Sequence, residues 1–297
     1  MSEGSQSEEW RLRYLALWAE RARIAYGMIA DGETDPMRII QMLEHLGRHF
    51  TLGFNTAGTV WIRNKSDPKT LLPSGIPAFR KASFNGQSIQ VSAYTYANIP
   101  YFLADFFREQ GPFDAVVELG CGFGQNLFRL NAAGLPRSLR YFGGELTESG
   151  VTLGRDLARL DPRIRVQFFP FDHLAPDLSA VTGVENPLVF TCHSLEQVTE
   201  VPQAFFAAVA GLAPRVTCVH LEPFGFQIRS VSLAAQEHRR HFEKEGWNLN
   251  LHAAAEAAEQ AGIIKRTVLI PDIFLSTDGV NVTSLMVWTK PGATRAG

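Results

Sequence analysis

The hydrophobic pattern of the chain changes near Phe113. Before that point, over residues 8–50, apolar side chains recur at three-to-four spacing, which predicts helices. Residues 51–90 are richer in Gly, Ser, Asn and Pro, so loops with short strands are predicted there. A further helix is predicted over residues 94–109, and the Gly-Pro pair that follows should end it.

From Phe113 onwards, short apolar runs alternate with helical stretches. This alternation is typical of βαβ units, in which helices cover both faces of a parallel sheet. A polar helical insertion is predicted at about residues 228–262. The two last strands are joined by too short a segment for a crossover helix, so they should pair antiparallel. The predicted strands, which together make an α/β fold with a seven-stranded and mostly parallel sheet, are 115–119, 141–145, 165–169, 188–192, 216–221, 266–271 and 284–289.

Composition narrows the range of partners. The 297 residues are 45% hydrophobic and 20% charged, as in ordinary soluble globular proteins, and the net charge of −2 gives no footprint for nucleic acid or an anionic membrane. No apolar run approaches the ~20 residues that span a bilayer, and the acidic, polar N-terminus is not a secretory signal. The three cysteines form no C-x-x-C pair. We expect a cytoplasmic protein with a small-molecule partner.

A glycine-rich loop follows the first strand of the predicted sheet. In VVELGCGFGQN, Gly120, Gly122 and Gly124 stand where parallel sheets bind their ligands, and glycines let the backbone approach a ligand closely. The G-x-G-x-G spacing differs from the G-x-G-x-x-G that seats a dinucleotide pyrophosphate. The carboxylate of Glu118 would repel a pyrophosphate but attract an ammonium group. For the glycines alone, a tight turn without a ligand is the alternative.

Two more acidic residues follow the next two strands. Glu145 stands where a carboxylate can accept hydrogen bonds from both hydroxyls of a ribose. Asp172 could accept from an adenine amino group, with Phe171 beside the ring. Each acid alone is more often a capping or solvated residue. Together with Glu118, they predict a cradle for a ligand that has a cationic amino-acid end and a nucleoside end.

On these motifs, residues 113–290 resemble the class I S-adenosylmethionine-dependent methyltransferases. ELGCGFG is similar to their first motif, and SLMVWTK to their final antiparallel strand. The chain departs from their pattern with Gln197 in place of a histidine and with Pro214-Arg215 in place of Pro-Gly-Gly. The resemblance implies a Rossmann-like fold with S-adenosyl-L-methionine as cofactor. The binding residues that it implies are Glu118, Gly120, Gly122, Gly124, Glu145, Leu146, Phe171 and Asp172. Tyr96 is added for its position at the start of the helix before the first strand, where its hydroxyl could reach the methionine carboxylate unless it packs in the core.

Candidate catalytic residues follow the fourth and fifth strands. His193 is the first choice for a base or acceptor-orienting group because imidazole titrates near neutrality, although it could instead bond the cofactor or the loop backbone. Glu222 could accept from a substrate hydroxyl or amine, act as a base, or serve as a structural cap. His220 shares a strand face with Glu222 and could partner either residue. Glu196 is more typical of a partner for a helix dipole.

Other uses of these side chains are weaker. The H-x-E of His220 and Glu222 is found in zinc deaminases, but the P-C-x-x-C that those enzymes also need is absent. His238 and His241 are spaced for one helix face, yet the surrounding charge indicates a solvated helix. A metal site is the alternative function for these side chains, but none is expected. Its ligands would be His193, His220, Glu222, His238 and His241.

The sequence says least about the acceptor. We expect residues 1–92 to form an N-terminal helical and loop cap and residues 93–297 to form the cofactor-binding domain, with the cap and the insertion as a lid. Trp10 and Trp18 look exposed, so a homodimer is the alternative to a lid. The segment EKEGWNLNLHAAAEAAEQAGIIK is similar to bacterial methyltransferases of small molecules and sugars. The expected function is methyl transfer to oxygen or nitrogen of a small polar metabolite or natural product; the alternatives are a non-catalytic binding module and an NAD-linked oxidoreductase.

Overall fold

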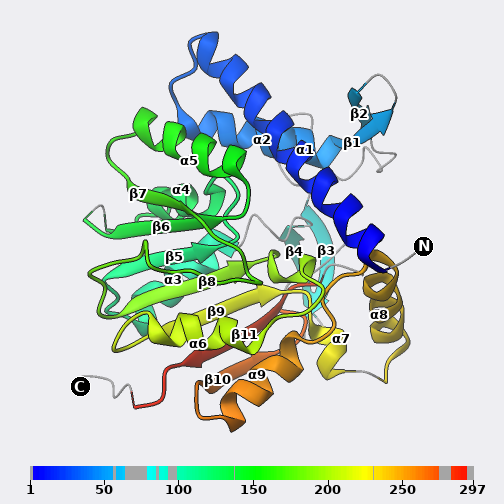
Figure 1. Ribbon diagram of the computed structural model, residues 1–297, viewed down its shortest axis with the longest axis vertical. Coiled ribbons are helices and arrows are strands. Elements are labelled where there is room, and N and C mark those ends of the chain that lie inside the picture. The colour runs from blue at the N-terminus through cyan, green and yellow to red at the C-terminus, as the bar shows by residue number, and fades with distance from the viewer. Residues whose placement is uncertain are drawn as a thin grey trace.

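A seven-stranded sheet forms the centre of the protein, and helices cover both of its faces (Figure 1). The computed structural model describes residues 3–55, 58–63, 79–84, 87–92, 99–136, 138–229, 231–273 and 282–292. Across the sheet the strand order is β10–β11–β9–β8–β5–β6–β7. The strands are β5 (Ala115–Leu119), β6 (Arg140–Glu145), β7 (Arg165–Pro170), β8 (Pro187–Cys192), β9 (Thr217–Glu222), β10 (Lys265–Ile270) and β11 (Ser284–Thr289).

The observed sheet confirms the predicted fold class. The five strands from β9 to β7 run parallel, and β11 pairs antiparallel with both β9 and β10. Each predicted strand is present, and its bounds differ from the predicted ones by at most one residue. The chain order of the strands places β5 and β8 side by side at the centre. Because the connection reverses direction across the sheet there, their carboxyl ends form the crevice where α/β sheets bind ligands.

Alternating side chains of the strands divide the core into two layers. On the first face, Val116 packs with residues of α3 (Ile99–Gln110), α4 (Gln125–Ala132) and α5 (Glu148–Leu160). On the second face, Val117 packs with residues of α6 (Gln203–Gly211) and α9 (Leu251–Gln260). Since side chains alternate along a strand, Glu118 belongs to the first face. The predicted helix over 94–109 corresponds to α3, and its first five residues lie outside the described part of the chain.

In its described parts, the N-terminal region forms two helices and two antiparallel strand pairs. Its elements are α1 (Glu3–Ala30), α2 (Pro36–His49), the antiparallel pair β1 (Phe50–Asn55) and β2 (Gly58–Arg63), and the antiparallel pair β3 (Phe79–Phe84) and β4 (Gln87–Ser92). The side chain of Asp35 caps α2 by accepting from the amide of Met37. Figure 1 shows α1 lying across the carboxyl ends of the strands.

Helix α1 is packed onto the sheet domain rather than exposed. Trp18, Ala22 and Ala25 are buried in the same hydrophobic cluster as the first face of the sheet. The hydroxyl of Tyr26 donates a hydrogen bond of 2.8 Å to Asp156 on α5. The expectation that Trp18 is exposed is therefore wrong, because its indole fills a space on the sheet domain. The division of the chain between residues 92 and 93 stays a prediction.

The insertion is helical, as predicted, but part of it is buried. It contains α7 (Gly225–Ile228), α8 (Leu233–Glu245) and α9. His238 of α8 packs against the rings of Phe226 and Phe242, at centroid distances of 4.6 and 4.8 Å. The prediction of a wholly solvated helix is wrong at this position, because α7 supplies an apolar partner for one face of α8. In the parts of the chain that the structure describes, no helix combines the length and the apolar character of a membrane span.

Candidate functional site

A cavity of about 750 Å³ opens at the carboxyl ends of β5 and β8. Its volume lies in the range of pockets that hold small molecules and cofactors. The loop after β5 contributes Glu118, Gly120 and Gly122, and the turn after β8 contributes His193. The wall is completed by α1, α2, β1, the start of α4 and the segment that follows α8. The lining residues of α1 and of the last segment include Arg13, Tyr14, Trp18, Arg21 and Trp247.

The glycine loop takes a conformation that suits glycine alone. Gly120, Gly122 and Gly124 all have left-handed backbones, with φ of 80°, 59° and 84°. A Cβ added to Gly120 would lie 2.4 Å from Cβ of Ser194, one on Gly122 would lie 2.2 Å from Cη2 of Trp18, and one on Gly124 would lie 2.6 Å from Cζ of Phe168. The loop therefore admits close neighbours from three different elements, as close-approach glycines should.

Glu118 is the one predicted acid that lines the cavity. Only 1% of it is exposed, and its Oε1 accepts a hydrogen bond of 2.6 Å from Nδ2 of Asn126. Its buried Oε2 has no hydrogen-bond partner among the described residues. Burial, opposed by the Asn126 hydrogen bond and assisted by the negative charge of Glu145, raises the pKa of this carboxyl to about 8. A buried acceptor left in this condition is costly, so a donor or cation that reached Oε2 would be strongly favoured.

Glu145 holds the loop together instead of facing the cavity. Its Oε2 accepts from the amide of Gly122 at 3.0 Å, and its Oε1 accepts from the amide and the hydroxyl of Thr147 at 3.0 and 2.9 Å. The side chain is fully buried. Burial raises its pKa, and the hydrogen bonds from Thr147 and Gly122 oppose that rise. In this arrangement the carboxylate of Glu145 fixes the start of α5 relative to the glycine loop.

Of the remaining predicted cofactor residues, those that the structure describes lie outside the cavity lining. Oδ1 of Asp172 accepts from the amide of Leu174 at 2.8 Å and so closes its own turn. Phe171 is buried on the second face, with its ring 5.1 Å from that of His173. Leu146 is half-buried beside Glu145. Tyr96 lies outside the described residues. Asp172 thus behaves here as the capping acid that was its alternative.

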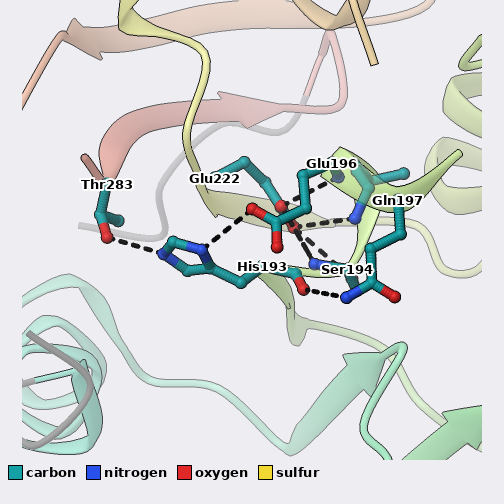
Figure 2. Close-up of polar contacts among 7 residues, drawn as sticks. His193, Ser194, Glu196, Gln197, Glu222 and Thr283 are labelled. Atoms are coloured by element: carbon teal, nitrogen blue, oxygen red, sulfur yellow. Dashed lines mark hydrogen bonds and ion pairs between the residues drawn. The ribbon is translucent and has the colours of Figure 1, made fainter. Parts of the chain in front are cut away.

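Glu222 anchors the turn that carries the candidate catalytic residues (Figure 2). Its two carboxylate oxygens accept from the amides of Ser194 at 3.0 and 3.1 Å, of Leu195 at 3.2 Å and of Glu196 at 3.3 Å. Burial and the charge of Glu196 raise the pKa of Glu222 to about 7, while His193 and the amides oppose that rise. A carboxylate surrounded by successive amides stabilises the loop around it. This geometry favours the structural cap over the predicted catalytic role.

His193 is held between two polar partners, and Figure 2 shows both contacts. Its Nδ1 lies 3.1 Å from Oε2 of Glu196, and its Nε2 lies 2.7 Å from Oγ1 of Thr283. The tautomer that satisfies both partners donates from Nδ1 to Glu196 and accepts at Nε2 from the Thr283 hydroxyl. The backbone of His193 is left-handed, with φ of 48°, which is uncommon outside glycine and asparagine. The turn anchored by Glu222 maintains this strained conformation.

His220 is a core histidine. It is fully buried, Nε1 of Trp288 donates to its Nε2 at 2.8 Å, and its Nδ1 lies 2.9 Å from the hydroxyl of Thr191. Burial lowers its pKa to about 3, so the ring is neutral at physiological pH. Its imidazole packs against the rings of Phe205 and Trp288 on the second face of the sheet, so it contacts neither His193 nor the cavity. Thr191 also bonds the carboxyl of Glu222, so the role of His220 beside a catalytic group stays a prediction. Among the described residues, no group of three or more His, Cys, Asp and Glu side chains is placed to bind a metal.

Three residues of the site were not predicted from the sequence in the places where the structure has them. Glu196 was expected to serve a helix dipole, although its position three residues after His193 is a usable signal for a hydrogen bond across a turn. Thr283 comes 90 positions after His193 and gives no local signal. Trp18 was placed in a cap or dimer contact, whereas it lies against the glycine loop. Such long-range contacts come from tertiary packing alone.

Comparison with known proteins yields likenesses of fold only. The chain matches no family model and no curated protein. It is similar to the crystal structure of magnesium protoporphyrin IX methyltransferase from Synechocystis with bound SAH, at 14% identity and a TM-score of 0.47, over 66% of this chain and 83% of that one. It is similar to geranyl diphosphate C-methyltransferase from Streptomyces coelicolor at 14% identity and a TM-score of 0.41, over 65% and 78%. A third likeness is the methyltransferase domain of bacterial Hen1, at 18% identity and a TM-score of 0.41, over 65% and 98%.

Proposed function

We propose that this protein is an S-adenosylmethionine-dependent methyltransferase that acts on oxygen or nitrogen of a small polar metabolite or natural product. The observation that carries the proposal is the buried carboxyl of Glu118, which lines a 750 Å³ cavity beside Gly120 and Gly122 and has an oxygen without a partner among the described residues. A cationic amino group suits that oxygen, because it would restore the charge that burial suppresses.

The residues present fit such a cofactor. Glu118 would hold the amino group of its methionine part, and Gly120 and Gly122 would let the cofactor come close to the loop. Glu145 would receive the ribose hydroxyls in place of its present donors. When bound, the cofactor supplies a methyl group that its sulfonium has already made electrophilic. The protein then has to exclude water and to orient the acceptor beside that group.

His193 is our candidate for the residue that orients the acceptor and takes up its proton. It lines the cavity, and because its Nδ1 faces Glu196, it would take up the proton at Nε2 once the Thr283 hydroxyl turns aside. Protonated imidazole donates from both nitrogens, and both partners can accept: Glu196 through its carboxylate and Thr283 by turning its hydroxyl. The surroundings of His193 therefore stabilise the imidazolium that proton uptake would create.

Isothermal titration calorimetry with the full chain tests the proposal. We expect S-adenosylmethionine and S-adenosylhomocysteine to bind in the micromolar range, and NAD to give no heat. Glu118→Gln keeps the Asn126 bond but removes the charge, and should weaken both nucleosides about tenfold or more, since a charge-assisted bond is lost. Glu148→Gln, on the exposed first turn of α5, is the matched control and should bind like the wild type. Binding of NAD without either sulfur nucleoside would reverse the assignment.

The acceptor class needs a separate experiment. The protein should be incubated with methyl-labelled S-adenosylmethionine and a panel of small metabolites that carry hydroxyl or amino groups. Label in a small polar product would support the proposed acceptor class. Label that accumulates only in macromolecules would contradict it while leaving methyl transfer intact.

A further inference from the structure

Trp18 of α1 lies directly on the glycine loop. The position that a Cβ of Gly122 would occupy is 2.2 Å from Cη2 of Trp18, so the indole rests against the Gly122 backbone. The ring also packs edge to face on Phe123, with centroids 5.6 Å apart, and the guanidinium of Arg21 lies 4.8 Å from its centroid. With only 8% of its surface exposed, Trp18 is seated in this place by contacts on several sides.

Tyr14 of α1 continues the contact made by Trp18 toward the tip of β6, the next strand. It lies one turn before Trp18 on α1, with ring centroids 5.9 Å apart. Burial raises the pKa of Tyr14, and the negative charge of Glu145 adds to the rise. Glu145 is itself fully buried. It accepts from the amide of Gly122, on which Trp18 rests, so the acid at the tip of β6 lies beneath α1 and outside the cavity lining.

Trp18 and Tyr14 cover one half of the proposed cofactor site. The cavity reaches Glu118, Gly120 and Asn126, so a methionine-like group has access to them with α1 in place. Glu145 lies outside the cavity lining but bonds the amide of Gly122, against which Trp18 stands. A nucleoside whose ribose bonds Glu145 would need the space that Trp18 and Tyr14 fill.

We infer that α1 belongs to the cofactor site, with Trp18 and Tyr14 as the residues that close its nucleoside half and that an incoming S-adenosyl nucleoside displaces from Gly122 and Glu145. This inference rests on the proposed function. The anchor of the movement is the carboxyl-terminal half of α1, where Ala22 and Ala25 are buried and Tyr26 bonds Asp156 of α5. The half that contains Tyr14 is the part that swings.

The need to displace Trp18 reduces the apparent affinity for the nucleoside, because only protein molecules in which α1 has moved aside can bind it. Removing the indole should remove most of this cost. We expect Trp18→Ala to bind S-adenosylhomocysteine about tenfold more tightly than the wild type in calorimetry, as the competent fraction rises. Leu12→Ala is the matched control on the same helix, since Leu12 is 62% exposed and lies outside the cavity lining, and it should bind like the wild type.

The outcomes separate this inference from the proposed function. If the wild type binds S-adenosylhomocysteine and Trp18→Ala binds it equally or more weakly, the inference fails and the proposed function stands. If neither protein binds the nucleoside, both fail. Binding by the variant alone supports both.

Hydrogen–deuterium exchange on the wild type avoids any folding defect of the variant. With S-adenosylhomocysteine added, amide exchange in residues 12–21 of α1 should become faster, while exchange in residues 118–126 becomes slower. Slower exchange in both segments would mean that α1 clamps onto the nucleoside in its present place, and would overturn the inference.

Discussion

His193 and Glu196 are joined by a hydrogen bond of 3.1 Å from Nδ1 to Oε2, across the turn that follows β8. Both side chains are more than nine-tenths buried, so the bond is shielded from water. A carboxylate in this position fixes the tautomer of the imidazole and stabilises its protonated form. The pair has the geometry of a base with its orienting group, and it lies on the wall of the cavity.

The first prediction concerns Glu196. Glu196→Gln keeps the shape of the side chain but removes the charge that stabilises the imidazolium. With an acceptor found by the labelling experiment, the rate of methyl transfer should fall by about a hundredfold, as for loss of general-base assistance. Calorimetry should show unchanged affinity for S-adenosylhomocysteine. An unchanged rate would remove His193 and Glu196 from the chemistry, and weaker nucleoside binding would instead indicate a role in holding the cofactor.

A second prediction follows from the amides around Glu222. Glu222→Gln has one acceptor oxygen where the wild type has two, so at least one of the amides of Ser194, Leu195 and Glu196 loses its partner. We expect a loss of about 1–3 kcal/mol in the free energy of unfolding, the usual cost of a buried unsatisfied group. Urea denaturation measures it. Glu185→Gln, at an exposed position, is the control; equal stability of the two variants would contradict the anchoring role.

The sheet could be predicted closely from the sequence because its signals are local. Strands buried on both faces appear as short apolar runs, as in β5, where the structure reproduces the predicted range of 115–119. The acids at strand tips follow from the same pattern, and Glu118 lies where it was expected. What those acids contact could not be predicted, since hydrogen-bond partners such as Asn126 and Thr147 are selected by loop geometry.

The position of α1 on the sheet domain could not be predicted from the sequence, for a different reason. Its pattern predicts an amphipathic helix, but the surface on which it docks lies about a hundred residues further along the chain. Only the packed structure shows that Trp18 faces Gly122. The orientation of His220 could not be predicted either. Alternation along the strand shows that His220 points away from the side of Val219 and Leu221, but it does not show which of the two sides faces α6 and α9.

A third prediction uses the pKa of Glu118. In the folded protein its pKa is raised from 4.5 to about 8, so the folded state binds more protons than the unfolded state between these values. The contribution of this carboxyl to stability is therefore greatest below pH 4.5 and is lost as pH rises to 8. Thermal unfolding across pH 5 to 8 should show a smaller decline in Glu118→Gln than in the wild type. An identical pH profile would show that the carboxyl is ionised throughout.

The last prediction separates glycines that the fold requires from one that it does not. Gly124 has φ of 84°, and a Cβ there would lie 2.6 Å from Cζ of Phe168, so Gly124→Ala combines backbone strain with a clash. Unfolding should become easier by about 1–3 kcal/mol, as for other strained or overpacked sites. Gly27→Ala, within α1, meets nothing within 4 Å and should instead stabilise the protein by about 0.5–1 kcal/mol, because alanine favours the helix. Chemical denaturation compares both variants with the wild type. If Gly124→Ala were as stable as Gly27→Ala, the glycine loop would tolerate a right-handed backbone, and its close contact with β7 would not constrain it.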